Sequence, residues 1–196
     1  METGTALLII VGVLALLGVA ILVFVFSNYN ALIQIKHNVD QAWSNIDVLL
    51  KQRHDELPKL VEVCRQYQKF EQETLERVMR ARQSVQEARQ RQDLGALGAA
   101  EGQLRAGLGG LFAVVENYPE LRTDERYRQL EARITSLEEA IADRREFYNA
   151  AVNINNVRME QFPTSILSGM ARMRSRRLLQ FSEAETRDVN LRELFN

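Results

Sequence analysis

The sequence predicts an all-α protein in which a single N-terminal transmembrane helix is followed by an antiparallel four-helix bundle. Three observations support this class. A long apolar run near the N-terminus contains no charged residue, and later stretches repeat apolar residues at alternating steps of three and four. The composition is dominated by helix-forming Leu, Ala, Glu, Arg and Gln, with only 3 prolines.

The apolar run extends from Ala6 to Phe26 and lacks charged residues, Asn, Gln and Pro. At about 1.5 Å per residue, a helix of this length crosses the roughly 30 Å of hydrocarbon in a bilayer. A cleaved signal peptide would have a basic start and small residues at its exit. Here METGT contains no basic residue, and the run ends in FVF before SNYN, with Phe and Val where small residues would be expected. We therefore expect a retained transmembrane helix at residues 6–26.

The orientation of the anchor is predicted from basic residues on its two sides. No Lys or Arg precedes it, and Lys36 is the only basic side chain within about 20 residues after it. This bias favours a short extracytoplasmic segment at residues 1–5 and a cytoplasmic location for the remainder of the chain.

The helical body is expected to cover residues 27–161. Four stretches repeat apolar residues at the spacing of coiled-coil helices, which places each set on one helix face that needs a partner. They are Leu32 to Leu49, Leu57 to Ala88, Leu97 to Tyr118 and Tyr127 to Asn155. No Gly or Pro separates the anchor from the first stretch, so we expect the transmembrane helix to continue directly into it.

The ends of the later helices can be predicted from capping residues and prolines. Asp93 is expected to cap the third helix and Pro119 to end it. Thr123 is expected to cap the fourth helix and Pro163 to end it.

The junction between the first two stretches, at residues 50–58, allows two interpretations. The signals for a turn are weak, because the junction contains no Gly or Asn for a sharp turn and Asp55 is only a fair cap. One helix could therefore also continue through a kink at Pro58. A turn gives a four-helix bundle, whereas a kink gives one very long helix and a three-helix body. We favour the turn.

The third stretch contains six glycines between Gly95 and Gly110. Each costs up to about 1 kcal/mol relative to Ala inside a helix. They indicate either close helix packing or a locally soft helix, and we favour close packing.

Signatures of catalysis and of cofactor binding are absent from the sequence. It has no G-x-S-x-G, G-x-G-x-x-G, Walker A or H-E-x-x-H pattern, and only two histidines and one cysteine, Cys64. Lys and Arg (25) nearly balance Asp and Glu (26), and the pI of about 6.2 does not indicate nucleic-acid binding. We expect no metal, no cofactor and no enzymatic activity.

Several polar residues occupy positions on or beside the apolar stripes. They form a candidate polar-core network of Arg53, Glu71, Glu101, Arg144 and Asn155. Their charged groups could reach water at the edge of the bundle, or they could pair internally and fix helix register, because a desolvated charge needs a partner.

The segment at residues 162–182 is basic and amphipathic, with apolar residues at helical spacing. Its candidate membrane-surface contacts are Arg172, Arg174, Arg176 and Arg177. Such a segment could bind an anionic membrane surface, or it could pack on the bundle with its arginines in water. Residues 183–196 form a C-terminal tail.

The sequence resembles the LemA family over residues 27–182. The resemblance is carried by Tyr29-Asn30, the block VDQAWSNIDVLLKQRHDELPKLVEVCRQY at 39–67, Tyr118-Pro119-Glu120-Leu121 and Tyr148-Asn149. Ile154-Asn155 stands where the family usually has Tyr-Asn, and the chain end after Gln180 also departs from the family. The resemblance implies a bacterial LemA-like bundle in the cytoplasm on one anchor, with the N-terminus outside.

These features lead to three functional hypotheses. The first is a non-catalytic helical scaffold of the bacterial inner membrane that acts by self-association or partner recruitment. The second is a regulatory adaptor of a membrane protease or another membrane enzyme. The third is an enzyme with an unrecognised site around Glu71, Glu101 and Arg144. The expected partners are membrane lipid, membrane proteins and a second copy of the chain, but no nucleic acid.

Overall fold

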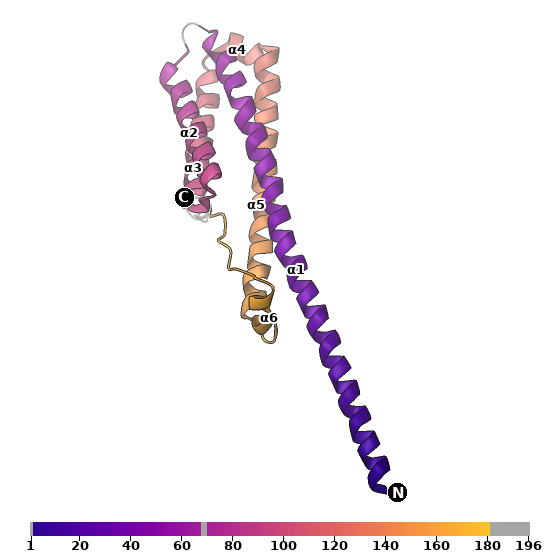
Figure 1. Cartoon of the computed structure of the whole chain (residues 1–196). Coiled ribbons are helices and arrows are strands. Elements are labelled where there is room, and N and C mark those ends of the chain that lie inside the picture. Colours follow the sequence, from indigo (N-terminus) through magenta and orange to yellow (C-terminus); the bar gives the residue numbers. More distant parts are fainter. Residues whose placement is uncertain (1, 68–69, 181–196) are drawn as a thin grey trace, which may run out of the picture. The chain divides into compact units, whose positions relative to one another are not determined.

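The computed structural model describes residues 2–67 and 70–180, and these contain helices but no strand (Figure 1). The helices are α1 (Glu2–Arg65), α2 (Gln72–Arg91), α3 (Leu94–Val115), α4 (Pro119–Thr123), α5 (Glu125–Glu160) and α6 (Thr164–Met170). The predicted all-α class is confirmed, whereas the antiparallel order of the bundle helices stays a prediction.

The chain divides into two compact units. The anchor unit comprises Met1–Gln41 and Ala150–Arg176. The bundle unit comprises Ala42–Asn149 and Arg177–Asn196, of which 181–196 fall outside the described residues. Helices α1 and α5 each contribute residues to both units.

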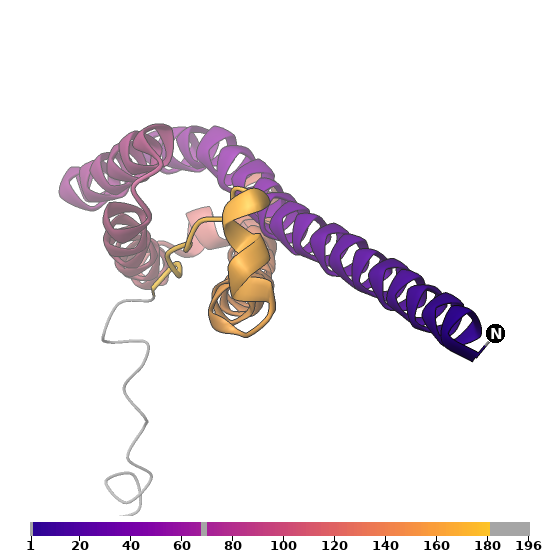
Figure 2. The ribbon, with the colours of Figure 1, turned by 60° about the horizontal axis from the view of Figure 1, so that its bottom comes forward.

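Helix α1 contains the predicted anchor and continues beyond it without a break, as Figures 1 and 2 show. It is the one helix among the described residues that is long and apolar enough to cross a membrane. Most described side chains of this apolar part are not covered by protein: Leu8 is 73% exposed and Val13 is 50% exposed, whereas Val25 near its end is partly buried. An exposed apolar helix of this length is suited to a lipid environment.

The turn predicted at residues 50–58 is wrong, because Pro58 lies inside α1. Proline has no N–H, so the carbonyl of His54 loses its usual helical donor. In its place Nε of Arg82 in α2 donates to the His54 carbonyl at 2.9 Å. The same guanidinium lies 2.6 Å from Nε2 of His54. This side-chain donor replaces the missing backbone hydrogen bond.

Helix α1 ends only at Arg65, and α2 begins at Gln72. The N–H groups of Gln66 and Tyr67 donate to carbonyls three residues back, which closes the last turn of the helix. The bundle unit therefore has four long helical segments, as expected, but the first junction lies after Arg65. These segments are 42–65 of α1, α2, α3 and 125–149 of α5.

The cap predicted for α3 is confirmed, whereas the cap predicted for α5 is wrong. Asp93 accepts from the N–H groups of Gly95 and Ala96 at 3.1 Å. Thr123 is the last residue of α4, and its hydroxyl donates to carbonyls within that helix. The next residue, Asp124, accepts from the first free N–H groups of α5 instead.

Close packing explains two of the glycines in α3. A Cβ on Gly98 would overlap the carbonyl oxygen of Gln180, and a Cβ on Gly107 would touch Val78 of α2. Gly109 and Gly110 face open space. The glycines therefore allow close packing at particular positions of α3 and not along the whole helix.

In the anchor unit, α6 packs on α1. Their contact forms a small hydrophobic cluster whose four buried residues are Leu32, Leu167, Ala171 and Met173. Partly buried side chains of α1 and α5 pack around it: Val25, Tyr29, Ile33, Ile35 and Met159. This small core fixes the short helix next to the part of α1 that follows the anchor.

The helical spacing seen in the basic segment applies only to its first part. Helix α6 ends at Met170, and residues 173–180 form an irregular segment with no helix or strand. Arg172 has a φ of 50°, and the N–H of Met173 donates to the carbonyl of Ser168 at 3.0 Å. This closing motif ends a helix and turns the chain away from it. The segment's last residues and the 183–196 tail lie outside the described residues.

Candidate functional site

A buried ion-pair network lies in the bundle unit. Arg53 of α1 is 1% exposed, and its Nη2 donates to Oε1 of Glu101 in α3 at 2.5 Å. Its Nη1 donates to Oε1 of Glu138 in α5, also at 2.5 Å. Nε of Arg105 lies 3.7 Å from the other oxygen of Glu138. Two arginines therefore balance two carboxylates across three helices.

The electrostatics keep the guanidinium of Arg53 charged. Burial alone would lower the pKa of Arg53, but the carboxylates of Glu101 and Glu138 outweigh it and raise that pKa above its usual value. A buried charge without a partner is strongly unfavourable, so the position of Arg53 depends on both acids. The network joins α1, α3 and α5 and contains no nucleophile.

The structure brings together two of the five residues predicted for the polar core, Arg53 and Glu101. It places Glu71 and Arg144 at exposed positions, outside this network. Asn155 is buried but belongs to the anchor unit. The hypothetical enzymatic site on Glu71, Glu101 and Arg144 therefore gains no support from the geometry.

The sequence pattern missed Glu138 and selected Arg144 where Arg145 is buried. A helical turn contains about 3.6 residues, so positions three and four after Ile141 both lie near the inner face. Spacing alone cannot choose between Arg144 and Arg145. In the same way, Glu138 follows the stripe residue Leu137 and reaches the buried Arg53 from its side.

In the anchor unit, asparagine side chains of α5 hold the irregular segment. Nδ2 of Asn156 donates to the carbonyl of Arg176 at 2.9 Å, and the N–H of Arg176 donates to Oδ1 of Asn156 at 3.0 Å. Asn155 donates to the carbonyl of Arg174 at 3.1 Å. These side-chain amides supply partners that a neighbouring strand would otherwise supply. Asn156 was not singled out from the sequence.

The bundle unit contains the same kind of contact. Asn149 of α5 donates to the carbonyl of Leu179 at 3.1 Å and accepts from its N–H at 2.9 Å. The hydroxyl of Tyr148 donates to the carbonyl of Arg177 at 3.1 Å. The family-like Tyr148-Asn149 pair therefore binds backbone, a role that the sequence did not reveal because the partner lies about thirty residues away.

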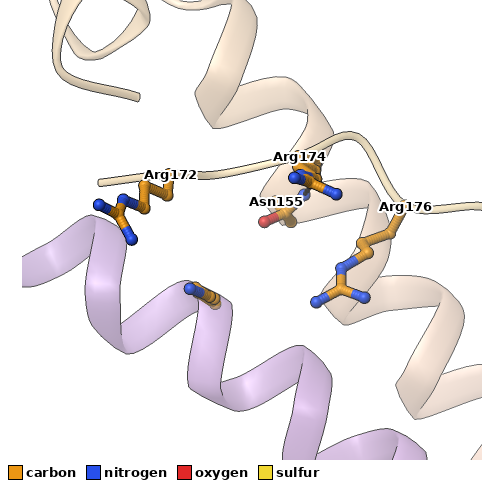
Figure 3. A pocket seen from close by; sticks show the side chains of 5 residues that line it. Asn155, Arg172, Arg174 and Arg176 are labelled. Carbon is orange, nitrogen blue, oxygen red and sulfur yellow. Dashed lines mark hydrogen bonds between the residues drawn. The ribbon is translucent and has the colours of Figure 1, made fainter. Parts of the chain in front are cut away.

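A basic pocket of about 340 Å³ lies in the anchor unit (Figure 3). Its lining consists of Lys36 of α1, Asn155 of α5, and Arg172, Arg174 and Arg176. Figure 3 shows the three arginines spread along the segment that follows α6, with Asn155 beside Arg174. Three of the four predicted membrane-surface arginines thus share one pocket, whereas Arg177 belongs to the bundle unit.

The described residues offer little for catalysis or metal binding. They contain no group of three or more His, Cys, Asp or Glu side chains that could hold a metal ion. Cys64 is buried, and burial raises its pKa to about 12, which keeps the thiol protonated. The basic pocket is lined by four cationic side chains and one amide, and this lining contains no acid–base pair.

A comparison with known protein families shows to which family the chain belongs. The model of the LemA family matches residues 42–192. The chain belongs to the LemA family. The match confirms the family that the resemblance indicated, and it includes Tyr148-Asn149 and most of the 39–67 block, whereas Tyr29-Asn30 precedes it.

Curated relatives include magnetosome proteins and a LemA protein. Magnetosome protein MamQ 2 of Paramagnetospirillum magneticum is 37% identical over 73 residues, which cover 37% of this chain and only 27% of the relative. Magnetosome protein MamQ of Magnetospirillum gryphiswaldense is 24% identical over 185 residues, covering 83% of this chain and 67% of the relative. Protein LemA of Metamycoplasma hominis is 26% identical over 184 residues, covering 92% and 82%. Together with the apolar helix, these similarities support a membrane-associated helical protein.

Proposed function

We propose that this protein is a non-catalytic scaffold of the bacterial inner membrane that acts through self-association of its helices. The supporting observation is an exposed apolar face on α5 within the anchor unit. Ile154 is 53% exposed and Val157 is 42% exposed, and Ala150 is also exposed. The spacing of four and three among these residues is that of a coiled-coil seam, which normally has a partner helix.

A second copy of the chain is the partner that this face fits best. Two α5 helices that meet through the same residues would form a symmetric contact, in which each apolar side chain is covered by its counterpart. The anchor would hold both copies in one membrane and raise their effective concentration, so a modest apolar face would suffice.

Two charge substitutions on α5 test this proposal. Ile154→Glu should abolish assembly of the full-length chain in lipid nanodiscs or native membranes, because it would bury a carboxylate in the contact. Thr135→Glu adds the same charge at an exposed position of α5 in the bundle unit, outside the apolar face, and should leave assembly unchanged. The readouts are particle mass and chemical crosslinking.

Two results would contradict self-association: a wild-type chain that stays monomeric at every concentration, or an Ile154→Glu variant that assembles like wild type. Crosslinking of this face to one membrane protease, without self-association, would support an adaptor role instead.

We also propose that the N-terminus lies outside the cell and the helical body in the cytoplasm. The support is the absence of Lys and Arg before the anchor and the presence of Lys36 after it. Protease treatment of spheroplasts should leave the body intact. Digestion of the body without cell lysis would refute this orientation.

A further inference from the structure

The pocket in the anchor unit carries positive charge that the described residues do not neutralise. Arg176 donates to Asp40 at 3.1 Å. Lys36, Arg172 and Arg174 form no ion pair within the described part of the chain. A volume of about 340 Å³ is within the range of small-ligand pockets, and arginine matches the geometry of a phosphate group.

Arg172 contributes to this pocket from an unusual backbone position. Its φ of 50° lies in the left-handed region, where glycine is the ordinary residue at the end of a helix. Glycine would therefore adopt this backbone conformation with less steric strain. Arg172 keeps a long basic side chain at this position, and that side chain lines the pocket.

Helix α6 connects the pocket to the anchor. Leu167 and Ala171, on its inner face, belong to the core that includes Leu32 and touches Val25, a residue of the predicted transmembrane run. Its outer side is apolar and uncovered, with Ile166 67% exposed and Met170 68% exposed, and Phe162 in the turn before the helix is 82% exposed. An uncovered apolar face beside a basic cluster is typical of a segment at the surface of a bilayer.

We infer that this pocket binds the phosphate headgroup of an anionic phospholipid from the bilayer that holds the anchor. The unpaired cations at positions 36, 172 and 174 contact the phosphate, and the apolar side of α6 contacts the acyl chains. A phosphate monoester carries about −1.5 to −2 charges near neutral pH, so phosphatidate should bind more tightly than a phosphodiester lipid. The bound lipid then contacts the folded anchor unit as well as the transmembrane helix.

The test titrates the full-length chain in detergent with short-chain phosphatidate, short-chain phosphatidylcholine and inorganic phosphate. Phosphatidate should bind more tightly than either of the other probes. Arg172→Gly should weaken phosphatidate binding by about fivefold or more, the effect of removing one basic residue near an anionic lipid. Arg172→Lys keeps the charge and should retain most of the affinity.

The chain offers a matched backbone control. Gln92, at the end of α2, has a φ of 53° and closes its helix in the same way, but it belongs to the bundle unit. Gln92→Gly should leave phosphatidate binding unchanged. Since glycine suits both backbone positions, neither variant should unfold the chain.

Three results would overturn the inference. They are unchanged phosphatidate binding by Arg172→Gly, equal affinity for phosphatidylcholine, and equal affinity for inorganic phosphate. The last result would assign the pocket to a soluble anion rather than to a lipid.

Discussion

The two units hold arginine under opposite conditions. In the bundle unit, Arg53 is 1% exposed and touches two carboxylates at 2.5 Å. In the anchor unit, Arg172 is exposed and has no ion pair among the described residues. Water solvates an exposed guanidinium, whereas a buried one needs protein partners. The same residue type should therefore support folding in one unit and remain available to a ligand in the other.

The largest effect is expected from Arg53→Met. It leaves Glu101, which is 4% exposed, without its cation, so the free energy of unfolding should fall by about 3–5 kcal/mol. Denaturant unfolding of the full-length chain in detergent measures this loss. The double variant Arg53→Met, Glu101→Leu should recover a large part of it. A loss below about 1 kcal/mol for the single variant would show that burial does not make Arg53 dependent on its partners.

A smaller loss is expected where the bundle unit is packed most closely. Gly98→Ala places a methyl group against the carbonyl of Gln180 and should cost about 1–3 kcal/mol. Hydrogen exchange at the amide of Leu179, which Asn149 holds, should become faster. Gly110→Ala, in open space, should instead stabilise α3 by up to about 1 kcal/mol. Equal effects of the two variants would argue against close packing at Gly98.

The Arg82 guanidinium, which also lies against the His54 ring, predicts a pH dependence. Partial burial and the Arg82 guanidinium lower the pKa of His54 from its ordinary value of 6.5. The folded pKa is then below the unfolded one, so this contribution to stability is complete above pH 6.5 and declines as the pH falls towards the folded value. His54→Gln should remove this decline from unfolding midpoints measured across that window. An identical pH profile in the variant would contradict the placement of the His54 ring beside Arg82.

Asp47 should produce a separate decline at lower pH. A side-chain hydrogen bond from Arg89 lowers its pKa below 3.8, so its contribution is present above that value and is lost as the pH falls through the folded pKa. The His54 decline begins near pH 6.5 and the Asp47 decline near pH 3.8, so the His54 effect is read from its onset at the higher pH.

The smallest effects on stability are expected at Arg172 and Gln92, the two residues with a left-handed backbone conformation. One lies in each unit, so the two variants compare the units directly. Arg172→Gly and Gln92→Gly should each leave stability unchanged or raise it, by less than about 1 kcal/mol, because glycine relieves the positive φ. Thermal unfolding in detergent measures both. A marked loss in Arg172→Gly alone would show that Arg172 supports the fold, which would remove the contrast with Arg53.

Local sequence signals predicted the parts of the fold that depend on neighbours along the chain. The apolar run and the cap at Asp93 follow from residues within a few helical turns, and so do the amphipathic stretches, except that the second, Leu57 to Ala88, is divided by the loop between α1 and α2. Arg53 and Glu101 could be selected because a charge on an apolar stripe needs a partner. The pattern could not distinguish Arg144 from Arg145, since a turn of 3.6 residues places both near the inner face.

Long-range contacts account for what the sequence did not reveal. Pro58 does not end α1 because Arg82 of another helix supplies a donor to the free carbonyl. The arginine segment is irregular because amides such as those of Asn149 and Asn156 bind its backbone. The basic pocket requires Lys36 and the arginines to meet from distant parts of the sequence.

The contrast between paired and unpaired cations is tested most directly by the effect of short-chain phosphatidate on the melting temperature. Wild type, Glu138→Gln and Arg172→Gly would be compared in the same detergent. Glu138→Gln should melt at a lower temperature but retain the increase that phosphatidate causes, since it weakens only the buried network. Arg172→Gly should melt at or above the wild-type temperature and lose most of that increase. An increase that survives in Arg172→Gly, or disappears in Glu138→Gln, would contradict the assignment of separate roles to the two sets of cations.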